Sequence, residues 1–236
     1  LSSPRPPRLA PLDAFDVAVR SNPEPCMDWI DLSRQTDAAR EDVARRVAEV
    51  LRAGQAAVLP TDTVYALTTA ASPGSRALEH LRTAIARRRL AGPGPYASTW
   101  HAPSPERVIE VLRPTSPLHR RIIRRLLPGP VRLEVELGKD APEAAARAGA
   151  APGSIEREGV LFVRGPDHPV VRAVASEVPE PLVAERAALF GWGDGRTISA
   201  TPASDADAVD LALDDGPTRY GKVSTVLRLT ARGGYA

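Results

Sequence analysis

Residues 58–67 read VLPTDTVYAL, and they follow the short apolar run that begins at Ala56. An apolar segment of strand length leads into Pro60, then into three small polar residues and an aromatic one. A short loop on a rigid strand holds hydrogen-bond donors and acceptors in place, which a small-molecule pocket requires. Taken alone, the segment also fits an ordinary strand followed by a polar turn, so the rest of the chain must decide.

Hydrophobic periodicity predicts helices and strands that alternate along the chain. The alternation is strictest at residues 131–137, which indicates a half-exposed strand. Residues 140–153 are typical of a helix fragment or a loop. We expect helices at 36–52, 75–89, 104–112, 117–127, 169–177 and 201–213, and strands at 56–59, 96–100, 131–137, 159–164, 181–184 and 225–229. This order predicts an α/β domain with a twisted sheet of mixed parallel and antiparallel strands and flanking helices.

The length of 236 residues fits one large domain with an appendage. Residues 1–30 are rich in proline and predict an extended N-terminal arm, which leaves 31–236 as the folded domain. Hydrophobic residues make up 43% of the chain, enough for a sizeable core, but aromatic residues make up only 4%. The core must therefore be built from Ala, Val, Leu and Ile.

Charge and cysteine content exclude several classes of protein. A net charge of +2 is too small to indicate a nucleic-acid-binding protein, although arginines cluster at 82–89 and 120–125. Cys26 is the only cysteine, so the chain can form neither an internal disulfide nor a cysteine metal site, and we expect a cytoplasmic protein. No apolar run approaches the roughly 18 residues of a membrane span, which argues against a membrane partner. Oligomeric state is left open.

Four later segments carry further motifs: ARRR at 86–89, LLPGPVRL at 126–133, GVLFVRGPDHP at 159–169 and DDGPTRYGKVSTV at 214–226. Together with residues 58–67, they resemble in order the motifs of the YrdC-like family, the threonylcarbamoyl-AMP synthases. The resemblance implies a single YrdC-like domain with a concave basic pocket. In the motif at 159–169, His168 directly precedes the helix expected at 169–177, and we expect the His168 side chain to cap that helix.

The resemblance implies roles for individual residues. Arg87 and Arg89 take the positions of a basic pair that faces phosphates and is catalytic, and Arg186 would join them in binding the nucleotide. The residues implied in substrate binding are Thr61, Thr63, Tyr65, Arg164, Ser224 and Thr225. A guanidinium grips a carboxylate or phosphate through two parallel hydrogen bonds, which suits these roles. Each segment also has a plain reading, as a solvated helix end or an ordinary loop entering a strand.

The implied reaction joins L-threonine, bicarbonate and ATP into threonylcarbamoyl-AMP and releases pyrophosphate. The protein would thus be a nucleotidyltransferase whose product serves threonylcarbamoyladenosine modification of tRNA. ATP would be a substrate accompanied by Mg²⁺, with no metal cluster bound by the protein. Catalysis would rest on positioning and charge neutralisation.

The chain departs from the family pattern at several positions. In the loop after residues 181–184, Arg186 and Phe190 replace serines, Ala188 replaces an asparagine, and Glu185 would repel polyphosphate unless it is paired. Elsewhere Ala66 replaces a glycine and Arg132 a threonine. Two alternatives therefore remain: a catalytically altered or inactive relative that binds RNA (tRNA or double-stranded RNA) or a nucleotide, and a carbamoyl-adenylate enzyme that uses another acceptor.

Overall fold

The computed structural model describes residues 27–88, 98–200 and 209–236. Its centre is one 10-stranded sheet with the order β1-β9-β2-β3-β8-β4-β7-β5-β10, and β6 pairs with β7 beside this path. The strands are β1 Asp28–Asp31, β2 Ala56–Leu59, β3 Ala66–Ala70, β4 Thr99–His101, β5 Val131–Glu136, β6 Glu156–Arg157, β7 Val160–Arg164, β8 Leu182–Arg186, β9 Leu211–Asp214 and β10 Thr225–Leu229. Parallel pairs such as β4 with β7 and antiparallel pairs such as β2 with β3 confirm a mixed sheet.

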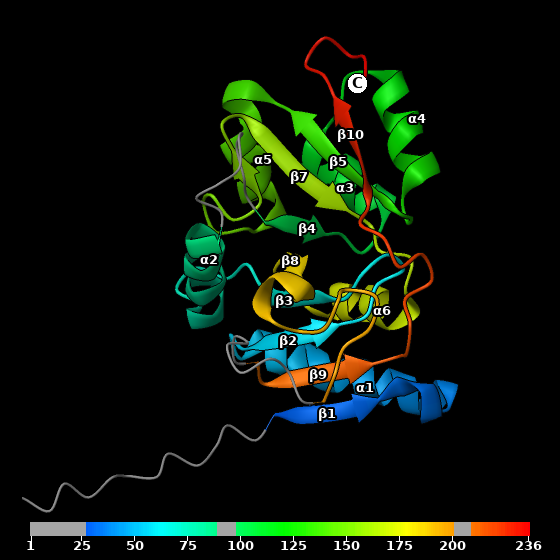
Figure 1. Cartoon of the computed structure of the whole chain (residues 1–236). Coiled ribbons are helices and arrows are strands. Elements are labelled where there is room, and N and C mark those ends of the chain that lie inside the picture. Colours follow the sequence, from blue (N-terminus) through cyan, green and yellow to red (C-terminus); the bar gives the residue numbers. More distant parts are fainter. Residues whose placement is uncertain (1–26, 89–97, 201–208) are drawn as a thin grey trace, which may run out of the picture.

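Helices flank the sheet, as expected (Figure 1). They are α1 Asp37–Arg52, α2 Arg76–Arg88, α3 Pro105–Leu112, α4 Pro117–Leu126, α5 Ala141–Ala148 and α6 Pro169–Glu177, with short 3-10 turns η1 Leu32–Arg34, η2 Gly138–Asp140 and η3 Ala187–Phe190. Hydroxyl caps set three of the helix starts. Thr36, Ser104 and Ser116 each accept a hydrogen bond from a backbone N–H three residues on.

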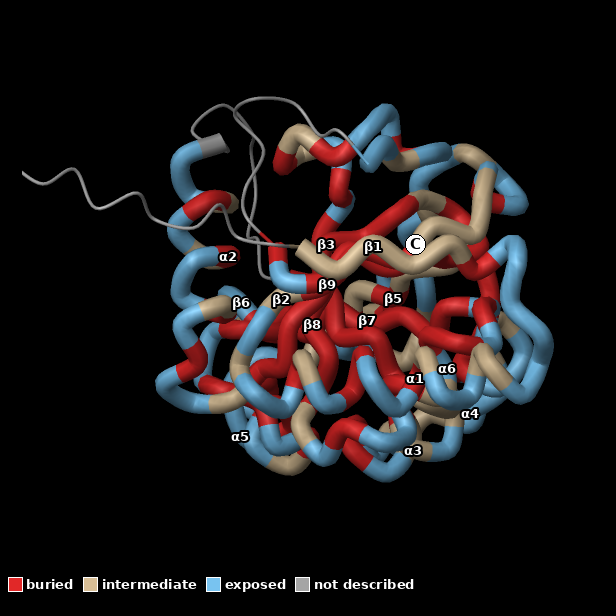
Figure 2. Tube along the Cα trace, turned by 90° about the horizontal axis from the view of Figure 1, so that it is seen from below, coloured by how far each residue is buried: buried red, intermediate tan, exposed pale blue. Residues whose placement is uncertain are grey.

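Two apolar clusters fill the space between the sheet and its helices. Figure 2 shows that buried residues gather along the strands at the centre of the molecule. One cluster lies between α1 and α6 and the strands around β2 and β9, and it includes Leu51, Leu59 and Val174. The other is larger and unites α2, α3, α4 and α5 with the remaining strands around Trp100 and Leu133. Small aliphatic side chains make up much of both clusters, which agrees with the low aromatic content.

The predicted layout needs correction at several places, and strands β3 Ala66–Ala70 and β6 Glu156–Arg157 were not expected at all. The helix expected at 201–213 is wrong at its end, because Leu211–Asp214 is strand β9, while 201–208 lie outside the described residues. β9 lies between β1 and β2, and its apolar residues are buried on both faces. Such a strand reads as a continuous apolar run, which periodicity cannot tell from a short buried helix. Residues 28–30, expected in the N-terminal arm, belong to β1, and 1–26 lie outside the described residues.

Candidate functional site

The loop between β2 and β3 is folded onto the hydroxyl of Thr61. This hydroxyl accepts hydrogen bonds from the backbone N–H groups of Thr63 at 3.1 Å and Val64 at 3.2 Å, and it donates to the Val64 carbonyl at 2.6 Å. Such local bonding from a threonine fixes a turn without help from a neighbouring strand. The loop is therefore rigid at the point where polar side chains gather.

Arg164, at the end of β7, is held by this loop. Its Nη1 donates to the Thr63 hydroxyl at 2.6 Å, and its Nη2 forms an ion pair with Asp62. Both partners of the ion pair are almost wholly buried. Burial lowers the pKa of Arg164, and the charge of Asp62 partly offsets this effect. Asp62 Oδ1 also accepts from the backbone N–H of Asp167 at 3.1 Å, so the guanidinium is fixed in position and orientation.

Tyr65 fastens the segment that carries residues 214–222 to the same loop. Its hydroxyl donates to the Gly216 carbonyl at 2.8 Å and accepts from the backbone N–H of Asp215 at 2.9 Å. Burial, followed by the charge of Asp214 among other causes, raises the pKa of the phenol, so Tyr65 stays protonated. This ring lies in the core and not on the cavity described below, which gives it a positioning part in the structure.

His168 occupies the N-cap position of α6, but its side chain makes no capping hydrogen bond, contrary to expectation. Nε2 instead lies 3.2 Å from Oδ2 of Asp215. The other oxygen of this carboxylate, Oδ1, pairs with Arg40 at 3.0 Å. Burial lowers the pKa of His168, against the opposing influence of Asp215. His168 thus helps Tyr65 to hold the 214–222 segment.

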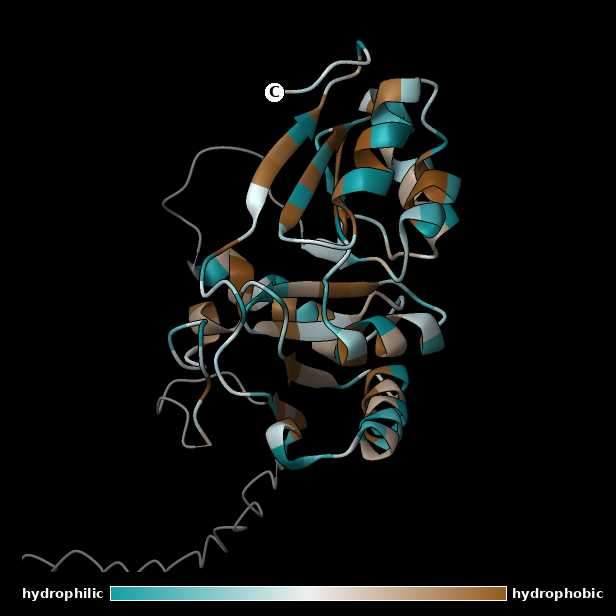
Figure 3. Cartoon of the chain, turned by 90° about the vertical axis from the view of Figure 1, so that its right-hand side faces the viewer, coloured by the Kyte–Doolittle hydropathy of each residue, from teal (hydrophilic) through white to brown (hydrophobic). Residues whose placement is uncertain are grey.

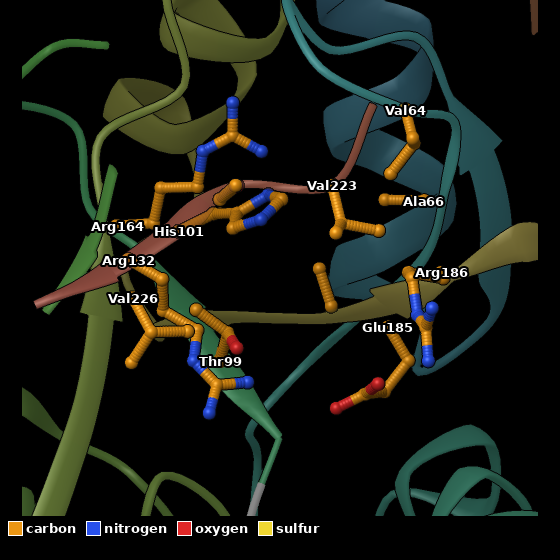
Figure 4. Close-up of a pocket in the computed structure, with 12 residues that line it drawn as sticks. Val64, Ala66, Thr99, His101, Arg132, Arg164, Glu185, Arg186, Val223 and Val226 are labelled. Carbon is orange, nitrogen blue, oxygen red and sulfur yellow. The ribbon is translucent and has the colours of Figure 1, made fainter. Parts of the chain in front are cut away.

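A cavity of about 290 Å³ opens beside Arg164 (Figure 4). Its apolar lining includes Val64, Val223 and Val226. The polar lining comes from four strands, β4, β5, β7 and β8, and from the segment before β10. It comprises Thr99, His101, Arg132, Arg164, Glu185, Arg186 and Ser224. Its volume is near the roughly 300 Å³ lower limit of pockets that hold small organic ligands. Three guanidiniums beside an apolar lining suit an anionic ligand with an uncharged part.

Arg132 is the cavity residue that sequence reasoning noted as a departure but did not place in the site. It lies directly opposite Arg164 in the β5–β7 register. Its guanidinium pairs with Glu134 at 2.6 Å and lies 5.2 Å from the centre of the Phe162 ring. Burial pushes the pKa of Glu134 up, but the hydrogen bonds from Arg132 and Arg228 outweigh it and leave the pKa low. Arg132 is thus pre-organised at the edge of the cavity.

His101, at the end of β4, is another cavity residue that the sequence did not single out. Its ring is buried, and Nδ1 has no hydrogen-bond partner among the described residues. Burial, together with the nearby charge of Arg164, lowers the pKa of His101 to about 3. A lone histidine just after the strand expected at 96–100 gives no signal of such a place, because the strand order that sets it beside Arg164 is not visible in the sequence.

This pKa makes the protein less stable in acid. The folded chain resists protonation of His101 down to a pH of about 3, whereas in the unfolded chain the imidazole takes up a proton near its ordinary value of 6.5. Between these values the unfolded state binds more protons, so the stability present above pH 6.5 is lost as the pH falls. Urea unfolding measured between pH 7 and pH 4 gives the free energy of unfolding at each pH. This free energy should fall less steeply with pH in His101→Leu than in the wild type. Equal slopes in the two proteins would show that His101 is not the source of the acid sensitivity.

The structure brings three of the predicted site residues together at the cavity: Arg164, Ser224 and Arg186. Thr61 and Thr63 lie just behind Arg164 and orient it. Thr225 is exposed on β10 and Arg87 is exposed on α2, and neither lines this cavity. Arg89 lies outside the described residues.

The altered loop after β8 has two kinds of substitution. Phe190 is fully buried in the larger apolar cluster, so its ring fills the core and not the cavity. Ala188 is exposed, and Gly191 ends η3 in the left-handed conformation. Ala66 lies on β3 in register with Arg186, and its methyl group lines the cavity. The loop after β8 therefore lacks polar side chains of the family pattern, but the ring of Phe190 does not block the cavity.

In the part of the chain that the structure describes, no group of three or more His, Cys, Asp or Glu side chains is placed to hold a metal ion. Among the same residues, no helix has both the length and the apolarity needed to cross a bilayer.

Residues 49–235 match the family model of Sua5, YciO and YrdC proteins, described as Telomere recombination. A Mycobacterium tuberculosis (strain H37Rv) protein provisionally named a threonylcarbamoyl-AMP synthase is 31% identical over 181 residues, which is 76% of each chain.

Solved structures share the fold. P. abyssi Sua5 complexed with L-threonine superposes with a TM-score of 0.62 at 24% identity, over 85% of this chain and 54% of that chain. The chain thus spans about half the length of that relative. E. coli YciO superposes with a TM-score of 0.56 at 20% identity, over 86% of this chain and 90% of that chain.

Proposed function

Because the chain belongs to the Sua5/YciO/YrdC family, we propose that it is a threonylcarbamoyl-AMP synthase, which joins L-threonine, bicarbonate and ATP and releases pyrophosphate. The product would serve threonylcarbamoyladenosine modification of tRNA. The mycobacterial relative carries the same provisional name. The cytoplasmic location expected from the sequence stays a prediction.

The fixed guanidinium of Arg164 is the observation that carries this proposal. Asp62 and Thr63 hold it so that it needs no reorientation when a ligand arrives. A pre-organised guanidinium in a water-poor site binds a carboxylate more strongly than an exposed one does. We assign it the carboxylate of threonine or the carbamate, with the Ser224 hydroxyl as a second contact on the same cavity.

Arg186 would bind the phosphates of the nucleotide. It lines the cavity, is exposed, and among the described residues has no ion-pair partner. Arg87 and Arg89 retain their predicted role as further phosphate contacts, although Arg87 does not line the cavity and Arg89 lies outside the described residues. Positioning the carbamate oxygen in line with the α-phosphate, with charge neutralised by these groups, is the chemistry that the residues can supply.

Mg²⁺ would enter with ATP. Magnesium usually keeps several waters and binds through one or two carboxylates together with substrate phosphates. Glu185 is a carboxylate of the cavity lining and is the candidate for such a contact. Mg²⁺ neutralises charge on the phosphates when it is bound, and the guanidiniums of Arg186 and Arg164 hold the two ends of the reactants.

Pyrophosphate release in the presence of ATP, Mg²⁺ and bicarbonate tests the proposal. We expect release that depends on L-threonine and that falls at least tenfold in Arg164→Lys, because an ammonium cannot reproduce the planar fork of guanidinium. Arg172→Lys, on the exposed part of α6, is the matched control and should leave the rate unchanged. Release that ignores threonine would overturn the proposal.

The lining also favours a second candidate, a carbamoyl-adenylate enzyme with another acceptor. Arg132 stands where the family pattern has a small hydroxyl, and Glu185 adds a carboxylate to the same cavity. Extra charges of both signs suit an acceptor with more charged groups than threonine. Pyrophosphate release with a panel of amino acids separates the two, since the second candidate predicts a faster rate with an acceptor other than threonine.

A further inference from the structure

A second cavity, of about 430 Å³, lies at the end of the β2–β3 hairpin opposite to the loop that holds Arg164. Its lining comes from the turn after α1, from β3, from α2 and from the residue directly before β9. Figure 1 shows α2 beside β2 and β3, and the cavity lies where this helix meets these strands. None of the described residues lines both this cavity and the one beside Arg164. Its volume exceeds the roughly 300 Å³ that a small organic ligand needs.

The carboxylate of Asp210 is fixed at this cavity. Oδ1 accepts a hydrogen bond from the side-chain amide of Gln55 at 2.7 Å, and Oδ2 accepts one from the backbone N–H of Ala56 at 3.0 Å. The backbone of Asp210 is held as well, because its N–H donates to the Ala56 carbonyl at 2.9 Å and its carbonyl accepts from the N–H of Asp28 at 3.0 Å. Asp210 is exposed, and each carboxylate oxygen keeps a further lone pair. The group can therefore accept a hydrogen bond from an ammonium without moving.

Arg76 supplies the opposite charge. It is the first residue of α2, it is exposed, and it has no ion-pair partner among the described residues. Arg82 of the same helix differs, because it pairs with Glu79 at 2.7 Å. The first N–H groups of a helix have no acceptor within it, and the helix dipole opposes a cation at this end. A carboxylate bound at the start of α2 would satisfy both the free N–H groups and the guanidinium.

One turn of the chain brings these two charges to the same cavity. The Ser75 hydroxyl, directly before α2, donates to the Gly54 carbonyl at 3.4 Å. The next residue, Gln55, is the one whose side-chain amide bonds Asp210. Arg76 and Asp210 are thus held against the turn at 53–56, and both line the cavity.

Apolar side chains also line the cavity. Leu67 of β3 and Leu81 of α2 are almost wholly buried, and the remaining apolar contacts are with Ala53, Ala56 and Ala77. Figure 3 shows hydrophobic residues along the strands at the centre of the molecule and hydrophilic bands on the helices outside them. The cavity combines both kinds of lining because it lies where a helix meets the sheet. An apolar group of a ligand would be removed from water there.

We propose that this cavity binds a free α-amino acid with an apolar side chain. Arg76 and the start of α2 hold its carboxylate, and Asp210 holds its ammonium group. A zwitterion matches one fixed charge of each sign, whereas a phosphate would be repelled by Asp210 and a simple amine by Arg76. The site is separate from the cavity beside Arg164 and does not depend on the proposed reaction.

Calorimetric titration with L-leucine, isoamylamine and isocaproate tests this proposal. The amine lacks the carboxylate of leucine and the acid lacks its ammonium group. Each should bind at least about tenfold more weakly than leucine, which is the effect expected for one lost charge-assisted contact. Arg76→Gln and Asp210→Asn should each weaken leucine binding by a similar factor. Arg172→Gln combined with Asp42→Asn removes one exposed charge of each sign from α6 and α1, and it should leave leucine binding unchanged.

The variant with both Asp62→Asn and Arg164→Met distinguishes the two cavities. Leucine should bind it as it binds the wild type, and loss of binding would place leucine beside Arg164 and overturn the proposal. Equal binding of leucine and its two analogues, or unchanged binding in Arg76→Gln and Asp210→Asn, would also overturn it. So would the absence of binding by L-leucine, L-valine and L-methionine alike.

Two further measurements keep the results separate. Circular dichroism checks that the variants fold. Without leucine, Arg76→Gln and Asp210→Asn should release pyrophosphate at the wild-type rate, because neither residue lines the cavity beside Arg164. If the wild type itself releases none, the proposed reaction fails while the leucine result stands.

Discussion

Arg164→Met is expected to lower the free energy of unfolding by about 3–5 kcal/mol, because it leaves the Asp62 carboxylate buried without its countercharge. Asp62 is fully buried, and its remaining contact is the N–H of Asp167. Urea unfolding measured at pH 7 gives the change directly. A loss smaller than about 0.5 kcal/mol would mean that the ion pair does not hold the loop.

The matched double variant separates fold from function. Asp62→Asn combined with Arg164→Met removes both charges and keeps an oxygen for the N–H of Asp167. Most of the lost stability should return, since replacing a buried ion pair by uncharged groups is often neutral. L-threonine binding should stay lost in the double variant, because the guanidinium that grips the carboxylate is absent. Recovery of both properties together would contradict the role of Arg164 in the site.

Phe190→Ser should also destabilise strongly, by about 3–5 kcal/mol, even though it restores the residue of the family pattern. The ring is fully buried in the larger apolar cluster, so its removal leaves a cavity in that cluster and buries a new hydroxyl.

Ala188→Asn is the control for this prediction. It restores another family residue at an exposed position, and it should change stability by no more than about 0.5 kcal/mol. Thermal unfolding of the two variants and the wild type measures both changes in stability. A Phe190→Ser protein as stable as the wild type would show that the loop after β8 tolerates the family pattern and that Phe190 has no packing role.

The sequence allowed the elements around the site to be predicted because their signals are local. The apolar run at Ala56–Leu59, the proline-glycine turn before β5 and the hydroxyl caps of α1, α3 and α4 depend on residues close in sequence. Strand β9 was missed because a short run buried on both faces has no periodicity. The sheet order was not predictable either, since pairing of β7 with β5 and β4 joins segments far apart in the chain.

The site shows the same division. Motif resemblance selected Arg164, Ser224 and Arg186, and the structure places all three on one cavity. It could not show that Tyr65 would anchor the segment at 214–216, because that depends on a contact across the fold. Nor could it place Arg132 and His101, whose positions follow from the strand register beside Arg164. The assignment of Arg164, Ser224 and Arg186 to ligand binding stays a prediction. The same holds for Thr61, Thr63, Tyr65, Thr225, Arg87 and Arg89.

Calorimetric titration with ATP and Mg²⁺, with and without L-threonine and bicarbonate, tests the central claim most directly. The proposed reaction predicts micromolar ATP binding that strengthens when threonine is present, through Arg186 and Arg164 on the same cavity. Absence of ATP binding under every condition would contradict the synthase proposal and leave a family fold that serves another ligand.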